Sequence, residues 1–162
     1  MKRIWLIPVA LTLTTASAMA PAMAEEFPPV KDAAVVKECS ACHIVFPPQM
    51  LPARSWKALL GNLGSHFGED ATVADPDRQV IVDYLTAHAA DGPATNGGGK
   101  YLRGIAATTT PLRITATPYW LRRHDEVSPA RFKSPQVKSA ANCAACHKGA
   151  AQGFFSEAEE EE

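Results

Sequence analysis

The sequence lacks an apolar run long enough to cross a bilayer comfortably. Its most hydrophobic stretch, residues 4–13, follows two basic residues and is much shorter than the roughly 20 residues of a membrane helix. Residues 22–24, Ala-Met-Ala, supply the small side chains that a signal peptidase recognises, just before two glutamates. We therefore expect residues 1–24 of the 162 to be a cleaved secretory signal peptide, rather than an uncleaved anchor. The mature chain from Glu25 onward should work in the periplasm.

A strong charge of one sign is also missing. Without the predicted signal peptide, 14 basic residues face 17 acidic ones, and five of the acids lie at 157 and 159–162 in a terminal tail that we expect to be disordered. The remaining part is nearly balanced, whereas a nucleic-acid-binding protein would carry a basic patch. We expect no nucleic-acid partner, contact with a membrane only through a partner, and one domain or two small lobes that share a core.

Cysteine is scarce, and its placement is the strongest signal in the chain. All four cysteines lie in two copies of one motif, Cys39-x-x-Cys42-His43 and Cys143-x-x-Cys146-His147. Two disulfides would suit an exported domain, but they would not explain the histidines. A histidine next to its cysteine cannot easily join both sulfurs at one tetrahedral zinc, and a redox dithiol needs no histidine. The motif predicts covalent attachment of c-type haem, with His43 and His147 as axial ligands of two irons.

Methionine is nearly absent from the mature chain, which limits the choice of a sixth iron ligand. The one methionine, Met50, follows His43 by seven residues among several prolines and is poorly placed to reach the far face of the same haem. Three histidines remain, namely His66, His88 and His124. Histidine at both axial positions would keep the reduction potential lower than methionine would.

Helical periodicity helps to choose among these histidines. In "LPARSWKALLGNLGSHFG", Trp56, Leu60 and Leu63 recur at helical spacing and His66 follows on the same face. In "TPYWLRRHDEV", Tyr119 and Trp120 precede His124 by about one turn, so an aromatic wall and the imidazole share a face.

His88 ends a further predicted helix, "DPDRQVIVDYLTAHAADG". We expect Asp75 to cap this helix, Pro76 to open it, and Val80, Ile81, Tyr84 and Leu85 to form its buried face. A histidine near a helix C-terminus interacts well with the helix dipole without any metal. We therefore take His66 and His124 as the distal ligands and keep His88 in reserve.

The chain resembles the small dihaem cytochromes c of bacteria. The resemblance covers nearly all of the mature sequence and rests on "CSACHIVFPPQMLPARSW", "HFGEDA", "PYWLRRHDEV" and the second "CAACH". It implies two covalently bound haems with bis-histidine ligation, and it supports His66 and His124 over His88. It also implies transfer of electrons to other redox proteins, with an oxygen-binding monohaem cytochrome c and a membrane cytochrome b among the partners of relatives. Sequence proximity favours His66 for the first haem and His124 for the second.

We expect a mainly α-helical protein with two lobes packed around the haems and long irregular loops. Residues 25–91 should form the N-terminal lobe with the first motif, residues 92–117 a Gly- and Thr-rich linker, and residues 118–156 the C-terminal lobe with the second motif.

The predicted function is electron transfer rather than catalysis. A haem with two axial imidazoles has no vacant position for oxygen or peroxide. Two rival functions remain open. A dihaem peroxidase needs a displaceable ligand and usually a longer chain. The dihaem subunit of a periplasmic reductase has motifs closer together than the 104 residues that separate Cys39 from Cys143.

Overall fold

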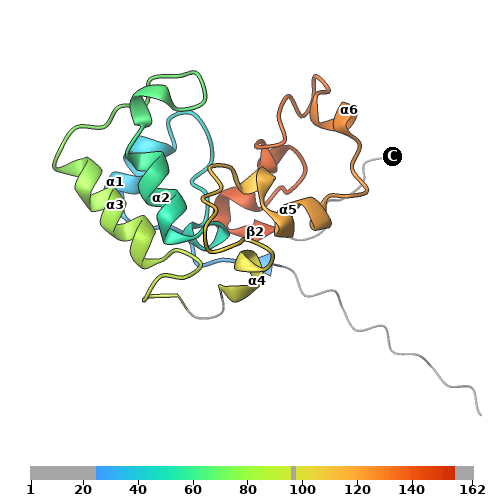
Figure 1. Cartoon of the computed structure of the whole chain (residues 1–162). Coiled ribbons are helices and arrows are strands. Elements are labelled where there is room, and N and C mark those ends of the chain that lie inside the picture. The colour runs from blue at the N-terminus through green and yellow to red at the C-terminus, as the bar shows by residue number, and fades with distance from the viewer. Residues whose placement is uncertain (1–24, 96–97, 156–162) are drawn as a thin grey trace, which may run out of the picture.

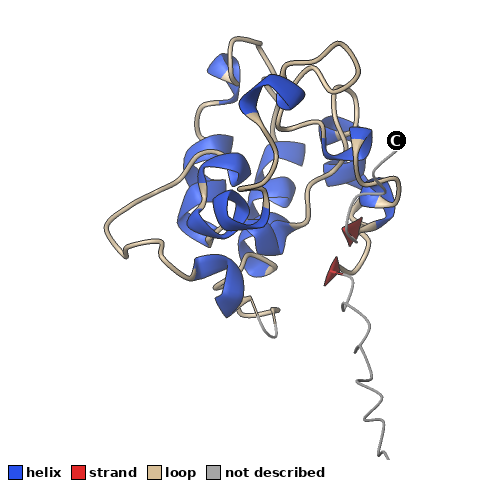
Figure 2. Ribbon diagram, turned by 90° about the vertical axis from the view of Figure 1, so that its right-hand side faces the viewer, coloured by secondary structure: helices blue, strands red, loops and turns tan. Residues whose placement is uncertain are grey.

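The computed structural model describes residues 25–95 and 98–155, so the predicted signal peptide and the acidic tail lie outside the described residues. Short helices joined by long loops make up most of this part, together with one two-stranded sheet (Figure 2). None of these helices is long and apolar enough to span a membrane. The elements are β1 Glu25–Glu26, α1 Ala33–Cys39, η1 Pro48–Met50, α2 Ala53–Leu60, η2 Leu63–Ser65, α3 Asp77–Ala87, α4 Gly99–Leu102, η3 Ile114–Ala116, α5 Pro118–Arg123, α6 Pro129–Phe132, η4 Cys143–Ala145, η5 Ala150–Gln152 and β2 Phe154–Phe155, where η marks a 3₁₀ helix.

The helices gather in two lobes, α1, α2 and α3 on one side and α5 and α6 on the other (Figure 1). This arrangement confirms the predicted mainly helical fold. The first lobe has the larger core, where α2 packs on α3 and α1 packs on α3. Its buried side chains are Val35, Leu51, Trp56, Leu60, Ile81, Leu85 and Ala89.

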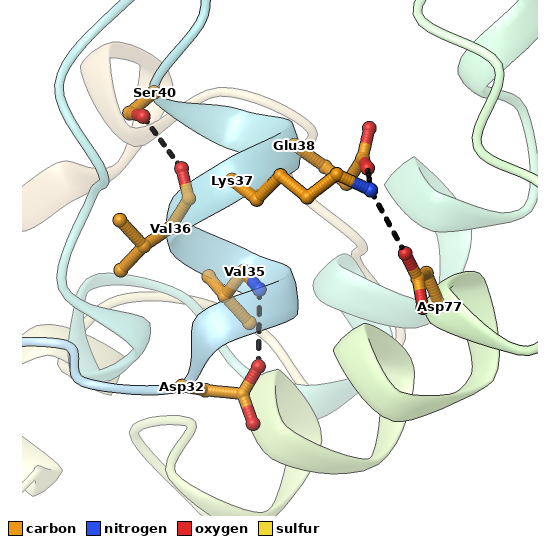
Figure 3. Close-up of polar contacts among 7 residues, drawn as sticks. All are labelled: Asp32, Val35, Val36, Lys37, Glu38, Ser40 and Asp77. Carbon is orange, nitrogen blue, oxygen red and sulfur yellow. Dashed lines mark hydrogen bonds and ion pairs between the residues drawn. The ribbon is translucent and has the colours of Figure 1, made fainter.

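Helix α1 carries the first cysteine and is held at both ends by polar contacts (Figure 3). The Asp32 carboxylate accepts a hydrogen bond from the Val35 amide at 3.0 Å and caps the N-terminus. In the last turn, the Lys37 ammonium lies 2.6 Å from Glu38 and 3.2 Å from Asp77, which begins α3. The helix that ends at Cys39 is thereby tied to the core helix beside it.

The proline-rich bend after the first motif is buried. Pro48, Leu51 and Pro52 are among the largest fully enclosed residues, and Trp56 Nε1 donates to the Pro48 carbonyl at 2.8 Å. The Pro48 carbonyl also accepts from the Leu51 amide at 3.4 Å, so a backbone and a side-chain donor both satisfy this acceptor.

Helix α2 is shorter than the periodicity predicts. It ends at Leu60, and a separate 3₁₀ turn, η2, leads to His66. Gly61 and Gly64 are poor helix residues and Asn62 favours turns, so the helix stops although the apolar spacing continues. Trp56 and Leu60 are buried as expected, but His66 does not belong to that helix.

The predicted start of α3 is wrong by one residue. The helix begins at Asp77 with Pro76 at the cap position, and Asp75 makes no capping bond. The Asp75 carboxylate instead lies 3.2 Å from the Arg78 guanidinium. The predicted buried face holds for Ile81 and Leu85, whereas Val80 is 43% exposed.

The segment at 92–117 does more than connect the lobes. It contains α4 and η3, and Tyr101 of α4 is buried with Phe27 and Met50. The Arg54 side chain of the first lobe donates to the carbonyls of Thr109 at 2.7 Å and Ala106 at 3.1 Å. The segment is therefore packed against the first lobe along part of its length.

The two ends of the described chain meet in the sheet. Strand β1 pairs antiparallel with β2, and the Phe27 amide donates to the Gly153 carbonyl at 2.9 Å. Phe27 is buried between Tyr101 and Phe155, at ring-centre distances of 5.3 and 5.5 Å. The start of the predicted mature chain thus packs against the C-terminal end of the described residues.

Candidate functional site

The first motif begins inside α1 and continues in the turn that follows it. Cys39 is the last residue of the helix, while Cys42 and His43 are exposed in the next turn. His43 Nδ1 lies 2.6 Å from the Ile44 carbonyl oxygen. Because a carbonyl can only accept, Nδ1 donates the proton and Nε2 keeps its lone pair. This is the tautomer that binds a metal through Nε2.

His66 faces His43 from a tight turn. The two ring centres lie 6.3 Å apart. The His66 amide donates to the Glu69 carbonyl at 2.8 Å and the Glu69 amide donates back at 3.1 Å, so the turn closes on itself. Phe67 takes a positive φ of 55° and Gly68 one of 105° to make it. Burial, with a smaller contribution from His43, lowers the pKa of His66, which favours the neutral imidazole that coordinates metals.

The second motif is folded by a single 3₁₀ turn, η4. The His147 amide donates to the Cys143 carbonyl at 2.8 Å, and the Asn142 side chain donates to the Val137 carbonyl at 3.0 Å. Burial raises the pKa of the Cys143 thiol to about 11, and burial together with Glu38 raises that of Cys39. Before haem is attached, both thiols are therefore protonated at neutral pH.

His124 faces His147 from the C-terminal end of α5, with ring centres 6.0 Å apart. Its ring stacks on Trp120 at 4.2 Å with an angle of 13° between the planes, as the shared-face prediction requires. His124 Nδ1 lies 3.0 Å from the Trp120 carbonyl oxygen, so this ring also keeps Nε2 free of a proton. Phe132 of α6 closes the aromatic wall, 5.4 Å from Trp120.

A cavity accompanies each motif. The larger, about 550 Å³, is lined by Cys143, Cys146, His147 and His124, and Met50 of the first lobe reaches it. The other, about 490 Å³, is lined by Cys42 and His43 and, from the opposite end of the chain, by Ala151 and Gly153. His66 does not line this second cavity. Both volumes fall in the range of about 300–1,000 Å³ that is usual for cofactor sites.

The paired histidines have the spacing of two ligands on one iron. A metal–imidazole bond is about 2 Å long, and the ring adds about 1 Å between nitrogen and ring centre, so trans imidazoles have centres about 6 Å apart. The pairs His43–His66 and His124–His147 both meet this distance.

The other interpretations of the cysteines find no support. The structure pairs none of the four cysteines in a disulfide. Within residues 25–95 and 98–155, no group of three or more His, Cys, Asp or Glu is arranged to hold a metal ion, which a zinc site would need. An iron that takes its equatorial ligands from a porphyrin needs only the two histidines.

His88 lines neither cavity, whereas Met50 lines the larger one. The His88 ring stacks on Tyr84 at 4.3 Å, and its Nδ1 lies 2.9 Å from the Tyr84 carbonyl oxygen. Met50 is buried in the small core beside Phe27 and Tyr101.

Sequence reasoning missed two residues beside His66. The Phe67 ring lies 4.8 Å from that imidazole, and the Arg113 guanidinium lies 4.1 Å from the centre of the Phe67 ring. Phe67 could have been suspected because it follows His66, whereas no pattern around Arg113 pointed to the turn.

The solved structures that resemble this chain are dihaem cytochromes c. No curated protein matches the chain. A dihaem cytochrome c structure from Rhodobacter sphaeroides is 48% identical, with a TM-score of 0.72, over 80% of this chain and 100% of its own. A structure of DHC purified from Rhodobacter sphaeroides is 44% identical, with a TM-score of 0.65, over 78% and 99% of the two chains. A dihaem cytochrome c of Shewanella baltica OS155 is 28% identical, with a TM-score of 0.58, over 79% and 98%.

A profile of the Dihaem cytochrome c family matches residues 35–155, which include both motifs. Two c-type haems, attached at Cys39 and Cys42 and at Cys143 and Cys146, are therefore its cofactors. With this match and these structural neighbours, the chain belongs to the dihaem cytochrome c family, whose members serve in electron transport.

Proposed function

We propose that this protein is a periplasmic carrier that passes single electrons between redox partners through two low-spin, bis-histidine haems. His43 and His66 would ligate the first iron, and His147 and His124 the second. The observation that carries the proposal is the distance between ring centres in the two pairs, 6.3 and 6.0 Å.

Each haem, when bound, supplies a one-electron couple whose potential depends on axial ligands, burial and nearby charge. The chain's own part is to anchor and orient. The cysteines fix the porphyrin edge, and the carbonyls of Ile44 and Trp120 hold His43 and His124 in the metal-binding tautomer. Two imidazoles per iron leave no position for oxygen or peroxide, which favours electron transfer over peroxidase chemistry.

The proposed location and partners rest on the sequence and on the family. The signal-peptide pattern of residues 1–24 supports export to the periplasm. Family resemblance supports other redox proteins as partners, namely an oxygen-binding monohaem cytochrome c as acceptor and a membrane cytochrome b as donor.

Optical and electron paramagnetic resonance spectra of the purified protein, before and after addition of carbon monoxide, test this proposal. We expect two low-spin ferric signals, which should be distinguishable because the ring planes meet at 32° in one pair and 85° in the other. We also expect no methionine–iron band and no carbon monoxide adduct. A high-spin population that binds the gas would contradict bis-histidine ligation and favour peroxidase or gas-binding chemistry.

A further inference from the structure

The two histidine pairs differ in the angle between their ring planes. The planes of His43 and His66 meet at 32°, whereas those of His124 and His147 meet at 85°. The distances between ring centres are similar, 6.3 and 6.0 Å, so the pairs differ in the rotation of the rings and not in their spacing. The rings of the second pair are close to perpendicular.

Trp120 contacts the His124 ring at both an edge and a face. Its carbonyl oxygen lies 3.0 Å from His124 Nδ1, and its indole stacks on the imidazole at 4.2 Å with 13° between the planes. The torsion that rotates a histidine ring is intrinsically broad, and a carbonyl oxygen accepts hydrogen bonds over a wide range of directions. The stacked indole is therefore the contact that fixes the plane of the ring.

The indole is itself held in place. Its residue lies in α5, four positions before His124, and the Trp120 amide donates to the Thr117 hydroxyl at 3.2 Å. Phe132 of α6 packs on the indole at 5.4 Å and lies 6.3 Å from the His124 ring at a tilt of 50°. Both Trp120 and His124 are half-buried and line the larger cavity. The orientation of the distal ring is thus set within one turn of helix.

The rings of the first pair are held differently. The stacked aromatic there is Phe46, which lies on His43 of the haem motif at 4.8 Å with 28° between the planes. The distal histidine, His66, contacts Phe67 at a tilt of 59°. The distal ring is therefore stacked in the second site and tilted in the first, and this difference accompanies the difference in angle between the pairs.

Ring orientation affects the iron because each imidazole acts through its π electrons on the d orbital that lies perpendicular to the ring plane. Two parallel rings raise the energy of the same d orbital, which favours loss of an electron to the ferric state. Two perpendicular rings act on different d orbitals, so this preference for the ferric state is lost and the reduction potential is higher. Contacts that orient an axial ligand are thus one means by which a protein tunes a haem.

We propose that Trp120 is a positioning residue that holds the His124 imidazole perpendicular to that of His147 and thereby raises the reduction potential of the second haem. This inference rests on the proposed bis-histidine ligation and adds a residue that makes two haems with the same ligands unequal. The rotation shifts a single electron toward the second haem. The ferrous iron of the first haem is oxidised as the ferric iron of the second is reduced, and no bond is made or broken.

The test is electron paramagnetic resonance of the ferric holoprotein, together with a redox titration followed by absorbance. Trp120→Leu removes the stacked ring but leaves the carbonyl that contacts His124, and Trp120→Phe keeps an aromatic ring. Tyr119→Leu is the matched control, because Tyr119 lies in the same helix, lines the same cavity and packs on Tyr101 at 4.8 Å. The low-spin signal that disappears in His124→Ala belongs to the second haem.

We expect the parent protein to give a rhombic signal from the first haem and a signal with a single large g value from the second. Trp120→Leu should turn the large-g signal into a rhombic one. It should also shift the distribution of one electron between the haems threefold toward the first, which corresponds to about 30 mV for a one-electron couple. Trp120→Phe and Tyr119→Leu should keep the spectrum and the titration curve of the parent.

Two rhombic signals in the parent, a large-g signal that survives in Trp120→Leu, or an equal change in Tyr119→Leu would overturn the proposal. Should Trp120→Leu fail to hold the second haem, Trp120→Phe still decides. A rhombic second signal in that variant would mean that a stacked ring at this position does not set the plane.

Carbon monoxide keeps failure of this inference separate from failure of the proposed function. If the parent binds no carbon monoxide and Trp120→Leu has the parent spectrum, the positioning role is wrong and the carrier function stands. If the parent binds the gas, bis-histidine ligation and the carrier function are themselves wrong.

Discussion

At the scale of single residues, histidines with similar sequence surroundings differ in what lies opposite the ring. His66 and His124 each face the histidine of a haem motif, whereas His88 faces Tyr84. His88 and His124 even make the same bond from Nδ1 to the carbonyl four residues earlier. The local bond therefore does not identify a ligand, but the residue across the site does.

We predict that His66→Ala and His124→Ala each convert one of the two haems to a high-spin form that binds carbon monoxide, because each removes one axial imidazole. His88→Ala should leave both haems low-spin. Carbon monoxide titration of the ferrous protein measures the fraction, about half of the haem in each of the first two variants. A carbon monoxide adduct in the His88 variant would show that His88 had been a ligand.

Arg113 acts on the first site through Phe67. Its guanidinium covers a ring that is 50% exposed and that touches His66. An exposed cation–π contact contributes about 0.5–1 kcal/mol. The contact joins η3, which follows directly, to the turn that holds the His66 ring in place.

We predict that Arg113→Ala loosens this turn and speeds ligand exchange at the first haem about threefold, as expected from the loss of about 0.5–1 kcal/mol. The rate of cyanide or added imidazole binding to the ferric protein measures the effect. Arg113→Lys should retain part of the contact. Arg103→Ala, at another exposed arginine of the same segment, is the control and should leave the rate unchanged.

At the scale of elements, short helices depend on their caps because they have few internal hydrogen bonds. Helix α5 has six residues and carries Trp120, with His124 at its end. Thr117 is 2% exposed, accepts from the Trp120 amide at 3.2 Å and donates to the Ile114 carbonyl at 2.8 Å. One side chain thus joins η3 to the helix that presents the second distal histidine.

We predict that Thr117→Val lowers the free energy of unfolding by about 1–2 kcal/mol, because it removes the N-cap and leaves the Trp120 amide without this partner. It should also give a fraction of the second haem that binds carbon monoxide. Thermal unfolding followed at the haem absorption band, together with gas titration, measures both. Thr110→Val on the exposed loop should change neither, and equal destabilisation by the two variants would count against the cap.

At the scale of the whole molecule, the two ends of the described chain are in direct contact. Gly153 has a φ of 90°, and a Cβ there would lie 2.4 Å from the Phe27 carbonyl oxygen. Only glycine fits this conformation and approach. The β1–β2 pairing places Phe155 5.7 Å from His147, so closure of the chain also supports the second haem site.

We predict that Gly153→Ala costs about 1–3 kcal/mol of stability and lowers the unfolding temperature by several degrees. Gly99→Ala is the matched control, because its Cβ would meet no atom within 4 Å, and it should be neutral or slightly stabilising. Calorimetry of the holoprotein gives both values. A Gly153 variant as stable as the parent would mean that the ends of the chain do not need this close approach.

Much of the fold and of the site could be predicted from the sequence because the signals are local. The Cys-x-x-Cys-His motif occupies five contiguous residues in one turn of chain. The two cysteines that attach a haem and the histidine that ligates its iron can therefore be predicted from the sequence alone. The aromatic wall of His124 follows from helical spacing within one helix. At the C-terminal end of α2, prediction failed because local turn residues overrode a periodicity that continued past them. At the start of α3, Pro76 takes the cap position that was predicted for Asp75.

The sequence by itself determined that this protein attaches two c-type haems, because the chemistry of attachment resides in contiguous residues. Only the tertiary structure decided which residues stand opposite His43 and His147, that Arg113 lies on Phe67, and that the chain ends pair. The residues in these contacts are between 23 and 130 positions apart in sequence, and the packing of loops around two small cores brings them together.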